Sequence, residues 1–123
     1  MLKIEPITDK TLLNKLSLDI FDKEFGADVG FVLFSGNEAA GLAKIKVSPF
    51  VSHIIEVGII KEDRGKGFGD FLTRSLLNAL TFVSEKIAVS YISPYFDKFG
   101  FEQNGEEMVV EAENLVFPRK CGG

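Results

Sequence analysis

Two different spacings of apolar residues run along the chain, and each predicts a different kind of element. Residues 2–5 alternate between apolar and charged side chains, which predicts a short first strand. Leucine and isoleucine then recur at helical spacing across residues 12–20, after Thr8 or Asp9, either of which can cap the first turn of a helix. This helical pattern fades in the polar, glycine-bearing stretch 22–30. The N-terminal part therefore predicts a strand followed by one amphipathic helix.

Three β-segments follow, joined by short turn signals. Residues 31–35 form an apolar run, and Gly36-Asn37 directly after it is a two-residue hairpin signal. Residues 39–48 alternate between aliphatic and lysine side chains, and residues 51–60 are rich in isoleucine and valine. Because the connections are this short, we expect the three strands to form an antiparallel meander.

The clearest helix of the sequence begins near Phe68, and a strand at residues 87–91 follows it. Apolar residues recur at helical spacing, and Thr73 falls among the outward positions. A strand, a long helix and a second strand in this order predict a crossover that joins two parallel strands. The predicted inner face of the helix comprises Phe68, Leu72, Leu76, Ala79 and Val83.

The C-terminal part of the chain predicts smaller elements. Pro94 can start a short helix, and Gly100 can end it. Residues 108–112 predict a strand, and residues 115–117 are expected to extend the sheet. Together the elements predict an α/β fold with a mixed, mostly antiparallel sheet flanked by helices.

Length and composition narrow the class of protein. A chain of 123 residues predicts a single domain over residues 1–123, with a loose tail from about 118 to 123. The net charge of −4 lacks the basic excess of a nucleic-acid binder, so no nucleic-acid partner is expected. No stretch approaches the roughly 18 apolar residues of a membrane span, and the N-terminus lacks the apolar core of a signal peptide. We therefore expect no membrane partner.

The cysteine content bears on disulfides, metal binding and the expected compartment. Cys121 is the only cysteine, so the chain can form no intramolecular disulfide and no cysteine-based metal cluster. Such a composition agrees with a reducing cytoplasm, and the expected location is cytoplasmic. No metal site is predicted. Cys121 also lies too near the end of the chain to be expected as a nucleophile.

The segment Arg64-Gly65-Lys66-Gly67-Phe68-Gly69 joins an apolar strand to the long helix and is the strongest chemical signal. The first turn of a helix carries unpaired backbone N–H groups and the positive end of the helix dipole, and glycines let a ligand approach the backbone closely. Such a turn can hold a diphosphate. A glycine-rich turn without a ligand stays open as an alternative.

Two nucleotide-binding motifs fit this segment poorly. The G-x-x-x-x-G-K-[ST] loop is absent. A dinucleotide-binding turn requires G-x-G-x-x-G, and Gly69 falls one residue too early for it. The preceding strands are also predicted to be antiparallel.

The chain resembles the GNAT acetyltransferase family. Arg64, Gly67 and Gly69 match the fixed positions of its [Q/R]-x-x-G-x-[G/A] signature, and the segment 95–101 matches its late aromatic–x–x–x–G–F element. The likeness covers about residues 31–117. It implies a GNAT-like fold that binds acetyl-CoA as cosubstrate. It implies that the backbone amides of Arg64, Gly65, Lys66, Gly67, Phe68 and Gly69 hold the pyrophosphate, and that the strand end Ile59-Ile60 pairs with the pantetheine arm.

The resemblance also implies an activity. The expected reaction is N-acetyl transfer from acetyl-CoA, by direct attack of an amine of a small molecule or a protein. A homodimer is expected because many small GNAT domains dimerise. Two alternatives stay open: a catalytically weak or inactive acyl-CoA-binding module, and a structural domain with an empty glycine turn.

The catalytic candidates follow from what amine acetylation requires. A base must take the proton of the amine, and the leaving thiolate must be protonated or stabilised. The family's usual tyrosine acid falls on Phe96, so Tyr95, one residue away, is the candidate acid, with Tyr91 second. The candidate bases are Glu56 and His53, which a regular strand would point to opposite faces.

Overall fold

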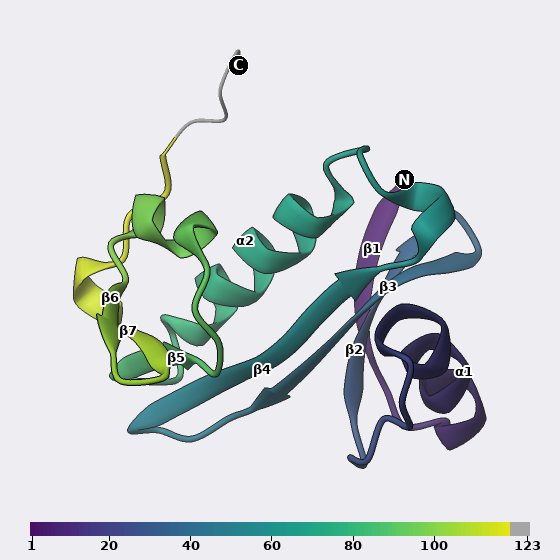
Figure 1. The fold of residues 1–123 in the computed structure, drawn as a ribbon, viewed down its shortest axis with the longest axis horizontal. Coiled ribbons are helices and arrows are strands. Elements are labelled where there is room, and N and C mark those ends of the chain that lie inside the picture. Colours follow the sequence, from purple (N-terminus) through teal and green to yellow (C-terminus); the bar gives the residue numbers. More distant parts are fainter. Residues whose placement is uncertain (119–123) are drawn as a thin grey trace. The chain divides into compact units, whose positions relative to one another are not determined.

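The computed structural model describes residues 1–118, so Cys121 and the tail from residue 119 onwards lie outside the described residues. Figure 1 shows the elements along the chain. They are β1 (Leu2–Ile7), α1 (Lys10–Phe21), β2 (Gly30–Ser35), β3 (Glu38–Lys46), β4 (Val51–Ile59), the 3₁₀ turn η1 (Lys61–Asp63), α2 (Phe68–Leu80), β5 (Lys86–Val89), η2 (Pro94–Phe99), β6 (Glu102–Asn104), β7 (Glu107–Glu111) and η3 (Ala112–Asn114).

The strands form a seven-stranded sheet in the order β1-β2-β3-β4-β5-β7-β6. The pairs β1–β2, β2–β3, β5–β7 and β6–β7 are antiparallel. β4 and β5 are parallel, and α2 connects them along the chain. The prediction of a mixed, mostly antiparallel sheet with flanking helices is therefore confirmed, as is the crossover between parallel strands.

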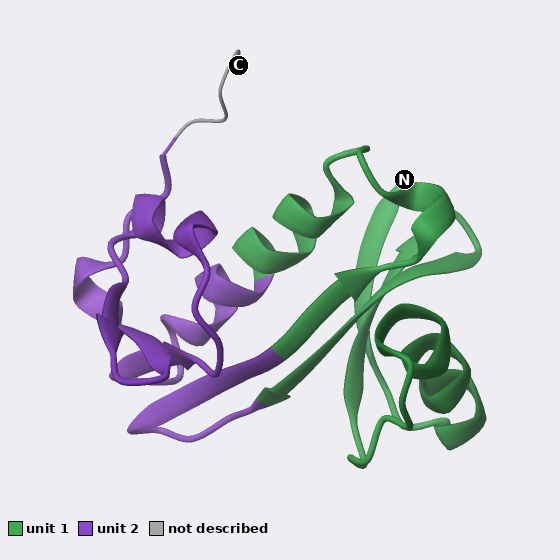
Figure 2. Ribbon diagram, in the orientation of Figure 1, with its two compact units in different colours: residues 1–45, 56–75 green, residues 46–55, 76–123 purple. Residues whose placement is uncertain are grey.

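The chain divides into two compact units, shown in Figure 2. Among the described residues, unit 1 comprises residues 1–45 and 56–75, and unit 2 comprises residues 46–55 and 76–118. β4 and α2 each contribute to both units. A single domain over residues 1–123 stays a prediction.

Unit 1 is built around α1 and the first strands. Asp9 caps the helix, because its Oδ1 accepts hydrogen bonds from the backbone N–H groups of Thr11 at 3.0 Å and Leu12 at 3.4 Å. The apolar face of α1 packs against β2 and β3, as the helical spacing predicts. The buried cluster comprises Leu13, Leu16, Phe25, Val32 and Leu42.

Unit 2 has its own core, in which aromatic rings are prominent. Ser93 caps η2 by accepting a hydrogen bond from the N–H of Tyr95, and Gly100 ends it with a positive φ of 96°. The edge-on contacts of Phe96 with Tyr91 and Phe101 bring the segments around η2 together. The start of β4 is tied to the connection between α2 and β5 by a buried hydrogen bond between the hydroxyls of Ser52 and Ser84, 2.5 Å apart.

The structure corrects three details of the sequence analysis. Residues 115–117 do not extend the sheet, since they follow η3; Leu115 N–H donates to the carbonyl of Ala112 at 3.2 Å and Val116 N–H to that of Phe99 at 3.1 Å. The short strand β6 was not predicted, because its residues are all polar. The buried stripe of α2 comprises Leu72, Thr73, Leu76, Leu77 and Leu80, whereas Ala79 and Val83 are exposed.

Candidate functional site

The turn between β4 and α2 holds two glycines in the left-handed region of backbone conformation. Gly65 has φ +83° and Gly67 has φ +81°, values that side-chain-bearing residues rarely adopt. A Cβ built at either position would meet no atom within 4 Å. The backbone conformation therefore requires glycine at both positions, and the space beside each Cα is open to a ligand.

The N-terminus of α2 follows this turn directly. The first backbone hydrogen bond of the helix runs from Phe71 N–H to the carbonyl of Gly67, 3.1 Å away. The N–H groups of Phe68 and Gly69 precede it, so the helix itself offers them no acceptor four residues earlier. These donors and the positive end of the helix dipole make the turn suited to an anion.

Arg64 links the turn to the end of β4. Its Nε donates a hydrogen bond to the carbonyl oxygen of Ile59 at 3.0 Å. The Cβ position of Gly69 lies 3.6 Å from Cγ1 of Ile59, so the start of α2 also packs on this strand end. Two contacts therefore hold the glycine-rich turn against β4.

Lys66 projects from the same turn but is paired within it. Its Nζ lies 2.7 Å from Oδ1 of Asp63 and 5.8 Å from the centre of the Phe68 ring. Asp63 therefore holds the Lys66 ammonium to itself, and without this pair the ammonium could approach an anion bound at the glycine-rich segment. The sequence analysis did not single out Asp63, the last residue of η1; its spacing of three residues from Lys66 is the signal that could have found it.

The strand end Ile59-Ile60 already uses several of its backbone groups. Ile60 N–H donates to the carbonyl of Ala40 at 2.8 Å, and the carbonyl of Ile60 accepts from Asp63 N–H at 3.0 Å. The carbonyl of Ile59 accepts from Arg64. A ligand that pairs with this strand end would share these carbonyls or bind the strand at neighbouring positions.

Glu56 lies in unit 1, as the turn does, and on the face of β4 that α1 covers. A Cβ at Gly58, two residues along the same face, would collide with the side chains of Ile20 and Phe21 at the end of α1. The Oε1 of Glu56 lies 2.8 Å from Nζ of Lys23, and its side chain is only 12% exposed. Lys23 is a partner that the sequence analysis missed, because no local spacing joins residues this far apart.

His53 belongs to unit 2, where its segment of β4 pairs with β5. Its Nε2 lies 3.5 Å from Oε2 of Glu107 on β7, and both side chains are partly exposed. The structure thus places the two candidate bases in different units and gives each a different charged partner.

The candidate acid Tyr95 lies on η2 in unit 2. Its ring contacts Phe96 and Phe99 edge-on, with centroid distances of 5.2 Å and 5.4 Å, and Lys98 Nζ lies 4.3 Å from the ring centre. Phe96, which occupies the position of the usual family tyrosine, is 2% exposed. Burial raises the pKa of the Tyr91 hydroxyl above its ordinary value of 10.0, so at neutral pH this phenol keeps its proton.

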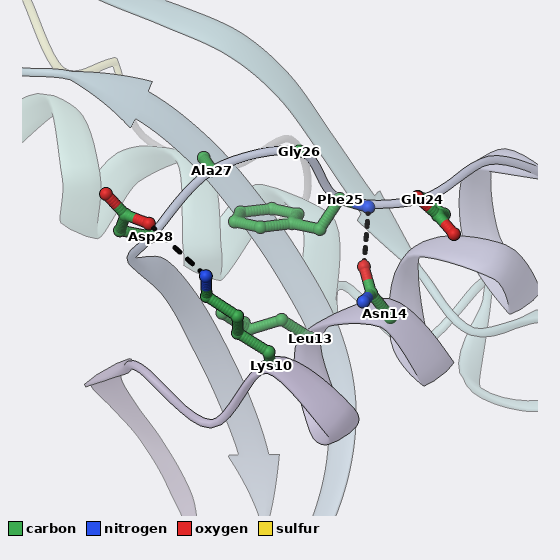
Figure 3. Close-up of a pocket in the computed structure, with 8 residues that line it drawn as sticks. All are labelled: Lys10, Leu13, Asn14, Glu24, Phe25, Gly26, Ala27 and Asp28. Atoms are coloured by element: carbon green, nitrogen blue, oxygen red, sulfur yellow. Dashed lines mark hydrogen bonds and ion pairs between the residues drawn. The ribbon is translucent and has the colours of Figure 1, made fainter.

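Unit 1 also contains a cavity that the sequence analysis did not anticipate (Figure 3). It has a volume of about 360 Å³ and lies between α1 and the segment that follows it. Asn14 Oδ1 accepts a hydrogen bond from Phe25 N–H at 2.9 Å, and Lys10 Nζ lies 3.7 Å from Asp28 Oδ1 at its rim. None of the predicted site residues lines it.

A metal centre or a membrane span would need particular side-chain groups or helices within residues 1–118. No group of three or more histidine, cysteine, aspartate or glutamate side chains in this part of the chain is placed to hold a metal ion. None of the helices described in it has the length and apolarity needed to cross a membrane.

The comparisons with known proteins rest on structure alone. No protein-family model matches the sequence, and no curated protein matches it either. Among solved structures, a GNAT family acetyltransferase from Brucella melitensis in complex with acetyl-CoA aligns with a TM-score of 0.72 and 12% identity, covering 90% of this chain and 88% of its own.

Two further structures are similar over nearly the whole chain. The ribosomal-protein-S18-alanine N-acetyltransferase from Escherichia coli aligns with a TM-score of 0.74 and 16% identity, covering 95% of this chain and 100% of its own. The KacTA–DNA complex contains a chain that aligns with a TM-score of 0.68 and 15% identity, covering 92% and 94%. The sheet order and these alignments together show that this chain has the fold of the GNAT acetyltransferases.

Proposed function

We propose that the protein is an acetyl-CoA-dependent N-acetyltransferase that transfers an acetyl group to an amine of a small molecule or a protein. The observation that carries the proposal is the turn before α2, where Gly65 and Gly67 adopt left-handed conformations beside open space. The same fold holds acetyl-CoA in the Brucella melitensis enzyme, which supports this choice of ligand.

In this proposal the pyrophosphate of acetyl-CoA binds the turn. The backbone amides from Gly65 to Gly69 supply hydrogen-bond donors, and the helix dipole adds a favourable potential. The N–H of Arg64 donates to the carbonyl of Lys61 at 3.3 Å, so a bound pyrophosphate would share it. Arg64 fixes the turn through its bond to Ile59 and carries a positive charge. The pantetheine arm follows the end of β4 at Ile59 and Ile60.

The proposed reaction is direct attack without an acyl-enzyme. The neutral amine nitrogen attacks the thioester carbonyl carbon, a C–N bond forms, and the C–S bond breaks to release the thiolate of coenzyme A. Glu56 takes the proton of the amine, directly or through water, with His53 as the second candidate base. Tyr95 gives a proton to the thiolate.

The partners proposed for the protein are amine acceptors. One structural neighbour acetylates an alanine of a ribosomal protein, which supports a protein amine as well as a small molecule. The KacTA neighbour is in a complex with DNA, so the expectation of no nucleic-acid partner stays a prediction. A homodimer and a cytoplasmic location are likewise predictions.

Release of free thiol from acetyl-CoA in the presence of a panel of primary amines tests the activity. The proposal predicts amine-dependent thiol release, one thiol per amide formed, with kcat at least about tenfold lower in Glu56→Gln. Thiol release that does not depend on any amine, together with binding of acetyl-CoA, would contradict transfer.

The runner-up is an acyl-CoA-binding module with little or no turnover. The observation that favours it is Phe96, whose buried ring offers no hydroxyl at the position of the usual tyrosine acid. Saturable binding of acetyl-CoA without amide formation for any amine of the panel would select this second function.

A further inference from the structure

The carboxylate of Glu56 occupies an unusual environment for a charged group. Its side chain is 12% exposed on the face of β4 that α1 covers. Removing a carboxylate from water costs several kcal/mol unless charged or polar partners replace the lost hydration. A partner for Glu56 is therefore required in any state of the protein.

The two oxygens of this carboxylate differ. Oε1 lies 2.8 Å from Nζ of Lys23. Oε2 is buried and has no hydrogen-bond partner among the described residues. A carboxylate can accept about four hydrogen bonds, so Glu56 has accepting capacity at Oε2 that Lys23 does not use.

Lys23 is a partner that can be exchanged. It follows the αL cap of α1 at Asp22, and its side chain is 59% exposed. An ion pair with so exposed a lysine is weak, because water solvates the ammonium almost as well and the four-carbon stem loses freedom in the pair. Little free energy is needed to move the Lys23 ammonium back into solvent, provided that a second cation takes its place beside Glu56.

We propose that Glu56 is the binding group for a cationic primary alkylamine and that Lys23 occupies this position until the amine arrives. The Lys23 ammonium is itself a primary alkylammonium, so exchange with a second one conserves both the charge and the ion pair with Oε1. An incoming amine can in addition reach Oε2, which Lys23 leaves without a bond.

This inference rests on the proposed function for its role in catalysis and names the acceptor class of that site. An acceptor ammonium bound to Glu56 stands next to the base that removes its proton before attack. Neutral aromatic amines lack the charge that replaces Lys23 and are expected to be poor acceptors. Lys23 acts by competing with the acceptor amine for the carboxylate of Glu56.

Calorimetric titration with n-butylammonium chloride, in the absence of acetyl-CoA, tests the exchange directly. Sodium chloride at the same ionic strength is the reference for salt effects. The Lys23→Met variant is expected to bind n-butylammonium about fivefold or more tightly than the parent, the size of a weak ion pair. Lys15→Met, which removes an exposed lysine from α1, should bind like the parent.

A double variant, Lys23→Met with Glu56→Gln, should lose the tighter binding, because the amide lacks the charge that attracts the cation. Lys23→Gln should fall between the parent and Lys23→Met, and it keeps the test open if Lys23→Met does not fold. Equal affinity in the parent and both Lys23 variants, or tighter binding that survives Glu56→Gln, overturns the inference.

Failure of the inference and failure of the proposed function are distinguishable. Amine-dependent thiol release with no effect of Lys23 on the acceptor KM would leave the acetyltransferase standing and overturn only the exchange. Tighter binding of n-butylammonium without any binding of acetyl-CoA would support the amine site and overturn the proposed function.

Discussion

Arg64 Nε donates a 3.0 Å hydrogen bond to the carbonyl oxygen of Ile59, and this bond fastens the glycine-rich turn to the end of β4. The guanidinium thus does more than add charge near a bound anion. It fixes the position from which the turn presents its backbone amides, and a turn held in place loses less conformational entropy on binding a ligand.

Replacing Arg64 by methionine should therefore weaken the binding of acetyl-CoA about tenfold. The change removes both the bond to Ile59 and a positive charge, and it keeps an aliphatic stem of similar length. Arg64 is exposed, so the free energy of unfolding should fall by no more than about 1 kcal/mol. Calorimetry beside urea unfolding measures both, and an unchanged Kd would show that the bond does not organise the site.

Asp63→Asn should strengthen the binding of acetyl-CoA about twofold to threefold at low salt. The substitution removes a negative charge beside the turn and frees Lys66, whose Nζ now lies 2.7 Å from Asp63. Because both ends of this pair are partly exposed, the gain should shrink as ionic strength rises. A Kd that is unchanged at low salt, or that rises, would place Lys66 away from the bound diphosphate.

The two tyrosines provide a matched pair for the acid. Tyr95→Phe should lower kcat about tenfold to a hundredfold while leaving the Kd of acetyl-CoA unchanged, since the ring contacts with Phe96 and Phe99 survive. Tyr91→Phe, which keeps the edge contact of that ring with Phe96, should leave kcat nearly unchanged. A loss confined to Tyr91→Phe would transfer the acid role to Tyr91.

Ser17→Ala should stabilise the protein by about 1 kcal/mol. The hydroxyl of Ser17 is fully buried in α1 and has no hydrogen-bond partner among the described residues, and alanine also has the higher helix propensity. Thr11→Ala, at an exposed position of the same helix, serves as the control for propensity. Urea unfolding measures the difference, and destabilisation by Ser17→Ala would reveal a bond to that hydroxyl.

Much of the fold could be predicted because local signals determine where its elements begin and end. Asp9 caps α1, and the Gly36-Asn37 turn joins β2 to β3, with Ser35 paired to Glu38 across it. Each signal consists of a few neighbouring residues, so its spacing and side-chain chemistry are visible in the sequence.

The inner face of α2 was predicted less well. Apolar residues at neighbouring positions, such as Leu76 and Leu77, leave more than one face of a helix apolar, so the pattern does not select among them. Packing selects the stripe that includes Leu80 and leaves Ala79 exposed. Val83 lies beyond the last residue of the helix and is half exposed.

The candidate site likewise contains a part that the sequence predicts and parts that it does not. The turn from Arg64 to Gly69 is continuous in sequence, and its two left-handed glycines could be expected from the motif. The ion pair of Glu56 with Lys23 joins residues that are far apart along the chain, as does that of His53 with Glu107. Such pairs depend on tertiary packing, which no local pattern reports.

Titration of the protein with acetyl-CoA by calorimetry, beside Gly67→Asp, tests the central claim most directly. Gly36→Asp is the matched control, because Gly36 also has a positive φ, at +63°, with no atom within 4 Å of its Cβ position. A diphosphate site at the turn predicts one-site binding in the parent and in Gly36→Asp, and loss of binding in Gly67→Asp, whose carboxylate would meet the diphosphate. A folded parent that does not bind acetyl-CoA, or equal binding by all three proteins, would contradict it.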